Sequence, residues 1–219
     1  MQHVFLLSPE TINYPILIGF LVSSAALTIS PGPDNIFVLT QSISNGVKAG
    51  LATVAGLVSG CLVHTTLLAF GVSEVIKRSD GLFLGIKLFG AAYLVYLAIK
   101  VYRSDASILL DKEKQPSQGP FKLFKTGFAM NVLNPKVTIF FLAFFPGFLF
   151  SEKLGTVMQF YILGLLFMLV AFIIFGTIAV LAGSISTYLM RHPKAGISLK
   201  WVQIVVFLGI AIYLLLSDK

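Results

Sequence analysis

The stretch TISPGPDNIFVLTQ, Thr28 to Gln41, decides how this sequence folds. Two prolines bracket a glycine and an aspartate follows, yet the residues on both sides are apolar. Proline removes a backbone donor and clashes with the preceding turn, so the motif predicts that one helix ends near Ser30 and another begins near Asp34. Within a membrane such a break persists only where it is buried in protein or lines a water-filled cavity.

The composition places the chain in a bilayer. Apolar residues make up 57% of the 219 positions and charged residues only 11%, whereas a soluble domain carries about 25% charged residues. The mean hydropathy is +0.92. A membrane-spanning helix needs about 20 apolar residues, and six windows of this kind occur, at residues 15–43, 50–71, 81–101, 127–150, 156–182 and 197–216. The sequence therefore predicts an all-α membrane protein with six transmembrane helices.

The basic residues are distributed unevenly between the two ends of these spans. The loops after spans one, three and five, with their flanks, hold ten: Lys48, Lys100, Arg103, Lys112, Lys114, Lys122, Lys125, Arg191, Lys194 and Lys200. The other loops and the termini hold four: Lys77, Arg78, Lys153 and Lys219. Because basic loops stay in the cytoplasm, we expect both termini outside and the central loop inside. The same rule accounts for the net charge of +7 without a nucleic-acid partner.

The chain divides into two halves. Residues 103–121 form its only long charged stretch with Pro and Gly, and we expect this stretch to be a cytoplasmic linker between a three-helix repeat at 1–102 and a second one at 122–219. The first span of each repeat is interrupted by a proline motif, SPGPDN at 30–35 and NPK at 134–136. Matching glycines follow at nearly the same offset: Gly50 and Gly60, then Gly155 and Gly164.

Three spans per half mean that the second half enters the membrane upside down. The pattern therefore predicts two inverted three-helix repeats, each with its first helix broken at a Pro motif. The alternative is that glycine and proline are scattered without any repeat. Small residues at four-residue spacing in span two, among them Gly56 and Gly60, predict close helix packing.

Asp34 is the only acidic residue deep inside a predicted span, and Lys136 is the basic residue comparably deep beside the second break. A carboxylate at the bilayer midplane costs about 2.5–3.5 kcal/mol and marks a functional site. Lys87 lies nearer a span end, from which its ammonium could snorkel to the surface. If the repeats are related by an axis in the membrane plane, Asp34 and Lys136 line one cavity. The other polar residues expected there are Asn35, Asn131, Asn134 and Thr138, with Thr40 and Gln41 as further groups.

Structural roles are open for the same residues. Asp34 could cap its half-helix, and Asp34 with Lys136 could be a structural ion pair. His64, in CLVHTTLL, could relay protons or be a hydrogen-bonded histidine within span two. An opposite-charge pair beside helix ends suits a zwitterionic amino acid, because its ammonium fits Asp34 and its carboxylate fits Lys136 or a helix N-terminus.

Three segments resemble the lysine-exporter (LysE/RhtB) family of bacterial amino-acid export transporters. PGPDNIFVLTQSISNGVKAGLATVAGLVSG resembles the family's first-span signature, IKLFGAAYLVYLAIKVYRS its third and FKTGFAMNVLNPKVTIFFLAFFPGF its fourth. The family's motif positions fall on Pro31, Gly32, Pro33 and Asp34, and on Asn134, Pro135 and Lys136. The resemblance implies a multi-pass protein of the bacterial cytoplasmic (inner) membrane that exports amino acids or close derivatives, driven by the proton gradient.

The leading hypothesis is therefore a secondary exporter that works by proton antiport, with alternating access around a midplane site. Asp34 and His64 are the candidates for proton coupling. The alternative is a divalent metal-ion exporter of a related membrane fold, but metals need clusters of carboxylate, His or Cys ligands. One deep Asp, one interior His and Cys61 are too few, so no metal site is predicted.

The spans contain no paired acidic residues, HExxH or serine-elbow motif, so we expect neither an enzyme nor a cofactor. The expected partners are an amino-acid substrate, protons and the lipid bilayer, and a homo-oligomer is left open.

Overall fold

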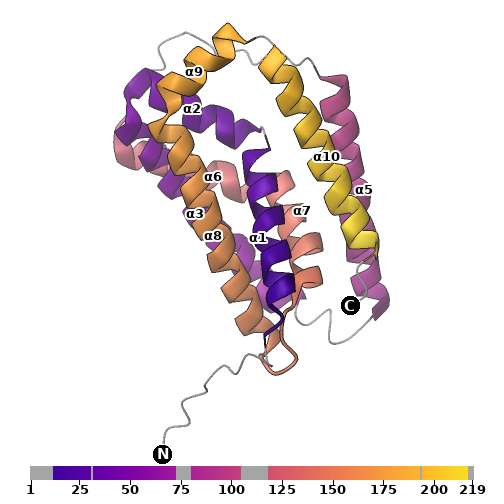
Figure 1. The fold of residues 1–219 in the computed structure, drawn as a ribbon. Helices are drawn as coiled ribbons and strands as arrows, with labels where there is room; N and C mark the ends of the chain where they lie inside the picture. Colours follow the sequence, from indigo (N-terminus) through magenta and orange to yellow (C-terminus); the bar gives the residue numbers. More distant parts are fainter. Residues whose placement is uncertain (1–11, 31, 73–79, 105–117, 193, 217–219) are drawn as a thin grey trace, which may run out of the picture.

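A computed structural model of the protein describes residues 12–30, 32–72, 80–104, 118–192 and 194–216. Every regular element in these ranges is helical, which confirms the all-α part of the predicted fold class (Figure 1). The elements are α1 (Tyr14–Ile29), α2 (Pro33–Asn45), α3 (Val47–Leu67), the π-helical turn η2 (Leu68–Val72), α5 (Asp80–Arg103), α6 (Pro120–Val132), α7 (Pro135–Phe144), the 3₁₀ turn η3 (Phe145–Phe148), α8 (Thr156–Val180), α9 (Ala182–Arg191) and α10 (Lys194–Leu216).

Four helices are long and apolar enough to cross a membrane: Val47–Val72, Leu84–Arg103, Thr156–Val180 and Ala195–Leu216. Two further pairs pass the same test together but are bent, α1 with α2 by 59° and α6 with α7 and η3 by 52°. The described residues thus hold four candidate spans, or up to six if each bent pair is one span. Some residues of the sequence analysis lie outside the described ranges. They are Pro31, most of the predicted linker 103–121, and the basic residues Lys77, Arg78, Lys112, Lys114 and Lys219.

Two boundaries differ from the prediction. The fourth window was expected to begin at residue 127, but α6 begins at Pro120, because its first turns mix lysines with apolar residues and so fall below the apolarity of a span. The fifth was expected to continue to residue 182, but α8 ends at Val180 and the short helix α9 follows. The Ser and Thr residues of α9 alternate with apolar ones, so a window that measures only mean apolarity does not detect it.

The helices form a main bundle and a side pair. In Figure 1, α5 and α10 run side by side, and α1 lies between this pair and α8, while α2 and α9 lie at the opposite end of the bundle from the start of α1. Within the main bundle α3 packs most extensively against α6. The pair of α5 and α10 contacts the bundle mainly through α7.

Glycine allows α3 and α6 to approach closely. A Cβ atom on Gly56 would collide with the backbone carbonyl of Phe124, and one on Gly127 would collide with the carbonyl of Thr53. A Cβ on Gly60 would lie 2.7 Å from Oδ1 of Asn131. The small-residue packing predicted for span two is therefore present, and α6 is the partner. It brings the end of α6 against the middle of α3, beside the second helix break.

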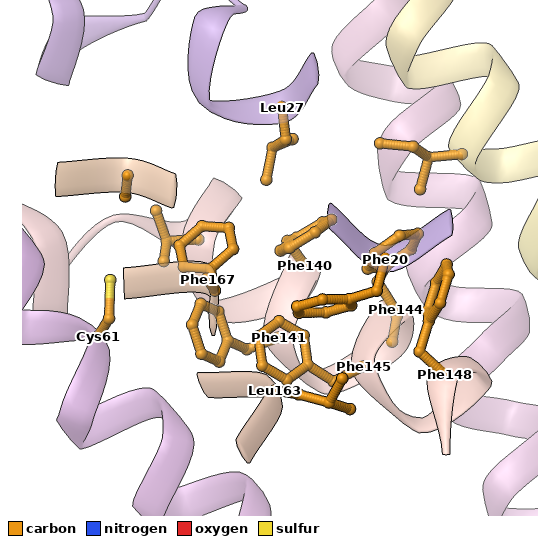
Figure 2. Packing of buried hydrophobic residues seen from close by; sticks show 14 of the residues in the cluster. Phe20, Leu27, Cys61, Phe140, Phe141, Phe144, Phe145, Phe148, Leu163 and Phe167 are labelled. Carbon is orange, nitrogen blue, oxygen red and sulfur yellow. The ribbon is translucent and has the colours of Figure 1, made fainter. Parts of the chain in front are cut away.

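A cluster of phenylalanines fills the interior between α1, α7 and α8 (Figure 2). Its members are Phe20, Phe140, Phe141, Phe144, Phe145, Phe148 and Phe167, all buried. The rings of Phe141 and Phe145 stack with centroids 4.1 Å apart, and those of Phe140 and Phe144 at 4.4 Å. These side chains therefore pack inside the protein. Pro146 lies in η3 just after the end of α7.

Candidate functional site

Four helix ends meet inside the bundle, and side chains hydrogen-bond the backbone at each break. Asn35 in α2 donates from Nδ2 to the carbonyl of Thr28 near the end of α1, at 2.9 Å. Asn134 caps α7, since its Oδ1 accepts a 3.1 Å hydrogen bond from the amide of Lys136. At the end of α6, Nε2 of His64 lies 3.1 Å from the carbonyl of Asn131. A carbonyl only accepts, so Nε2 carries the proton.

Asp34 connects the two breaks. It is only 9% exposed in the first turn of α2, where a carboxylate is favoured by the helix dipole. Its Oδ2 accepts a 3.1 Å hydrogen bond from Nδ2 of Asn134, the capping residue of α7. Its Oδ1 is buried and has no hydrogen-bond partner in the part of the chain that the structure describes. One carboxylate oxygen therefore joins the halves of the chain, and the other is left unpaired.

Lys136 occupies the first turn of α7, where a positive charge is disfavoured by the helix dipole by about 0.3–1 kcal/mol. Its half-buried side chain places Nζ 5.1 Å from the ring centre of Phe207 in α10. The same Nζ is 3.6 Å from the position a Cβ on Gly32 would take. Helix stability does not account for a lysine here, whereas the nearby carboxylate of Asp34 attracts its charge.

Asp34 and Lys136 line the same small cavity, of about 30 Å³. Asn35 and Asn131 also line it, and most of the remaining wall is apolar: Leu27, Leu57, Val58, Val137, Phe167, Ala171 and Phe175, with Thr28 and Cys61. The volume suits one or two water molecules, well below the about 300–1,000 Å³ of ligand pockets. A whole amino acid would enter only if the helices moved apart.

The other predicted site residues lie outside this wall. Thr138 donates a 3.1 Å hydrogen bond to the carbonyl of Asn134 and so supports the first turn of α7. His64 is buried and packs on Phe141 with ring centres 5.4 Å apart, and its ring bonds to the Asn131 carbonyl. Gln41 accepts a hydrogen bond from Asn45 within α2. The helix-break residues flank the site. Gly32 is the N-cap of α2, Pro33 is the first residue of α2, and Pro135 is the first residue of α7.

Three interpretations of the charged residues change. Asp34 does not cap α2, because Gly32 is the N-cap and no side chain bonds there. Within the described part of the chain Asp34 and Lys136 form no direct hydrogen bond; Asp34 instead accepts from Asn134. Lys87, whose ammonium could have snorkelled to the surface, has a buried side chain in the third turn of α5.

Sequence reasoning missed Thr28, Cys61, Phe167 and Phe207 at the site. Aromatic and small residues are frequent in every span, so nothing in their local sequence separates a cavity wall from a lipid-facing surface. A search of the described residues finds no group of three or more His, Cys, Asp or Glu side chains that could hold a metal ion.

Comparison with known proteins gives one family model and three relatives that bear on this chain. The chain matches the family model described as "LysE type translocator" over residues 25–218. It is similar to the "Homoserine/homoserine lactone efflux protein" of Salmonella typhimurium, strain LT2, with 33% identity over 176 residues that cover 80% of this chain and 84% of that protein. The protein of the same name from Salmonella typhi is 34% identical over the same shares.

A third relative is the "Uncharacterized membrane protein YrhP" of Bacillus subtilis, strain 168. It is 33% identical over 141 residues, which cover 61% of this chain and 67% of that protein. No solved structure matches the chain significantly.

Proposed function

Because the chain belongs to the family of LysE-type translocators, we propose that it is a secondary transporter that exports amino acids or close derivatives across the bacterial cytoplasmic membrane by proton antiport. The observation that carries the proposal is the buried cavity lined by both Asp34 and Lys136. A small molecule with an ammonium and a carboxylate offers each of them a partner, and two relatives are named for efflux of homoserine and homoserine lactone.

We propose that the substrate binds at the helix breaks. Its ammonium contacts Asp34, and its carboxylate contacts Lys136 and the N-terminal turn of α7, where the helix dipole adds attraction. Asn35, Asn131 and Asn134 complete the polar surroundings, and Thr138 holds the turn that carries Lys136. The helices stay interrupted at the proline motifs, so that the helix ends face the substrate. The residues of these motifs are Pro31, Gly32, Pro33 and Pro135.

Each bent helix pair is, in this proposal, a single interrupted span, so that six spans form two inverted repeats of three, residues 1–102 and 122–219, joined by a cytoplasmic linker at 103–121. Both termini then lie outside the cell. This orientation agrees with the basic residues at the end of α5, the start of α6 and the end of α9, which share one end of the bundle (Figure 1).

Alternating access around this site explains the small cavity. The cluster of phenylalanines lies along α7 and η3 and includes Phe20 from α1 and Phe167 from α8 (Figure 2). We propose that it separates the cavity from the end of the bundle where α1 begins. For a substrate to leave in that direction, α1, α7 and α8 must separate. We propose that the two halves rock about the helix breaks, and that protonation of Asp34 from outside weakens its hold on the ammonium and releases the substrate. His64 serves by holding the end of α6.

Counterflow in liposomes tests the proposal. Purified protein is reconstituted with an unlabelled amino acid inside, and uptake of the same labelled amino acid is followed for each of the twenty amino acids and for homoserine. At least one is expected to exchange well above protein-free liposomes. Flux of Mn²⁺, Zn²⁺ or Cd²⁺ with no amino-acid exchange would favour the divalent metal-ion exporter instead, which the scarcity of ligand clusters in the described residues disfavours.

A further inference from the structure

Two buried oxygen atoms of residues at the cavity have no hydrogen-bond partner among the described residues. They are Oδ1 of Asp34, on a side chain 9% exposed, and Oδ1 of Asn131, on a side chain 3% exposed. Both residues line the same cavity, and they come from opposite halves of the chain. A buried acceptor left unsatisfied costs about 1–3 kcal/mol, so a ligand group that donates to both oxygens would gain from each of them.

The size of the cavity indicates what kind of donor fits. About 30 Å³ accommodates a group the size of a water molecule, and an ammonium group is of that size. An ammonium carries several N–H donors, and hydrogen bonds that involve a charged group are about twice as strong as neutral ones. A carboxylate is excluded, because both unpaired atoms are acceptors.

We infer that Asp34 Oδ1 and Asn131 Oδ1 together form a preformed subsite for a primary ammonium group, and that Asn131 selects primary amines over N-substituted ones. The inference rests on the proposed export of amino acids and deepens it. Asp34 supplies the charge, and Asn131 supplies a second acceptor that only an amine with more than one N–H can use while it stays bonded to Asp34.

Asn131 is held for this task by its surroundings. Its backbone carbonyl accepts from His64, and its side chain lies against Gly60, where a Cβ would come within 2.7–3.0 Å of three of its atoms. The hydrogen bond from His64 and the missing side chain at Gly60 thus fix the position of Asn131 relative to α3. His64 and Gly60 are positioning residues, and neither lines the cavity.

The test compares two probes of equal charge on the full-length protein in liposomes. L-homoserine has three N–H donors, and N,N-dimethyl-L-homoserine has one. Each is measured as a competitor of labelled homoserine counterflow, in wild type and in Asn131→Leu, which keeps the volume of the side chain but removes the acceptor. We expect Asn131→Leu to raise the half-inhibitory concentration of homoserine about ten-fold or more and to leave that of the dimethyl compound within two-fold. Asn131→Ser, which restores an acceptor, should recover part of the loss.

Thr126→Val is the matched control, because Thr126 lies on the same helix as Asn131 but outside the cavity wall, and its hydroxyl bonds to the carbonyl of Lys122; both half-inhibitory concentrations should match wild type. The inference is overturned if both probes weaken equally in Asn131→Leu, or if the dimethyl compound competes as well as homoserine in wild type. It is also overturned if replacing Na⁺ by choline abolishes counterflow, because the two oxygens would then hold an inorganic cation. Absence of exchange for every amino acid tested would instead contradict the proposed function. Thermal unfolding in detergent shows whether each variant is folded.

Discussion

Nδ2 of Asn134 donates a 3.1 Å hydrogen bond to Oδ2 of Asp34, two residues separated by 100 positions in the sequence. The same Asn134 caps α7 through its Oδ1. The amide group of Asn134 therefore links the first turn of α2 to the first turn of α7. The position of the Asp34 carboxylate and the position of Lys136 depend on each other through this link.

Replacing Asn134 by serine separates these two tasks. Serine caps helices about as well as asparagine, but its short side chain cannot also reach Asp34. We expect Asn134→Ser to keep the melting temperature within a few degrees of wild type and to lower the rate of amino-acid exchange ten-fold or more. Asn134→Ala should lose the cap as well, at about 1 kcal/mol. An exchange rate for the serine variant equal to that of wild type would show that the Asp34 bond is dispensable.

Lys136→Met should weaken binding of substrates that have a carboxylate. The variant keeps the length of the side chain and removes its charge, so the apparent KM for a free amino acid should rise at least ten-fold. The corresponding methyl ester, which has no carboxylate, should be affected less than three-fold as a competitor of counterflow. Lys125→Met is the control, because Lys125 is exposed on α6 and its Nζ lies over the ring of Phe121. An equal loss for acid and ester would place the carboxylate elsewhere.

The glycine contact between α3 and α6 should determine stability. Gly56→Ala places a methyl group against the Phe124 carbonyl, and overpacking of this kind costs about 1–3 kcal/mol. Gly176→Ala in α8 adds the same methyl group where no atom lies within 4 Å. Alanine favours a helix over glycine at both positions, so the difference between the two melting temperatures reports the packing alone. We expect Gly56→Ala to melt several degrees lower, and similar melting temperatures would refute close α3–α6 packing.

Gln159 fixes the connection between η3 and α8. Its buried side chain accepts from the amides of Phe150 and Ser151 at 2.7 and 3.0 Å and donates to the carbonyls of Ser151 and Leu154, each at 2.8 Å. Gln159→Leu leaves these backbone groups without their partner, and we expect it to cost about 2 kcal/mol or more. Thr177→Val, on the exposed part of the same helix with a bond only to Ile173, should change stability by less than about 0.5 kcal/mol. Equal melting temperatures in detergent would contradict this role.

Much of the helix pattern is predictable because a bilayer imposes a length and an apolar composition on each span. The windows near α3, α5, α8 and α10 agree with the structure within a few residues. The start of α6 is not predictable in this way, because Lys122 and Lys125 interrupt its apolar residues, and α9 is amphipathic rather than uniformly apolar. α6 packs against α3, and α9 packs against α2. A search for uniformly apolar windows does not take such contacts into account.

The polar residues of the site are predictable because charge and amides are rare inside membrane spans. Asp34, Asn35, Asn131 and Lys136 stand out for that reason, and the structure brings them to one cavity. Their partners are not predictable. That Phe207 lies beside Lys136, or that Asn134 rather than Lys136 bonds Asp34, depends on how distant helices cross.

The central claim is that the carboxylate of Asp34 couples amino-acid export to protons. The most direct measurement follows homoserine, or whichever amino acid shows counterflow, in reconstituted liposomes after a pH step, for wild type and Asp34→Asn. Asparagine keeps the size of the side chain and removes the titratable charge. Wild type should accumulate the amino acid against its gradient, and Asp34→Asn should not. Accumulation by Asp34→Asn to the level of wild type would contradict the claim.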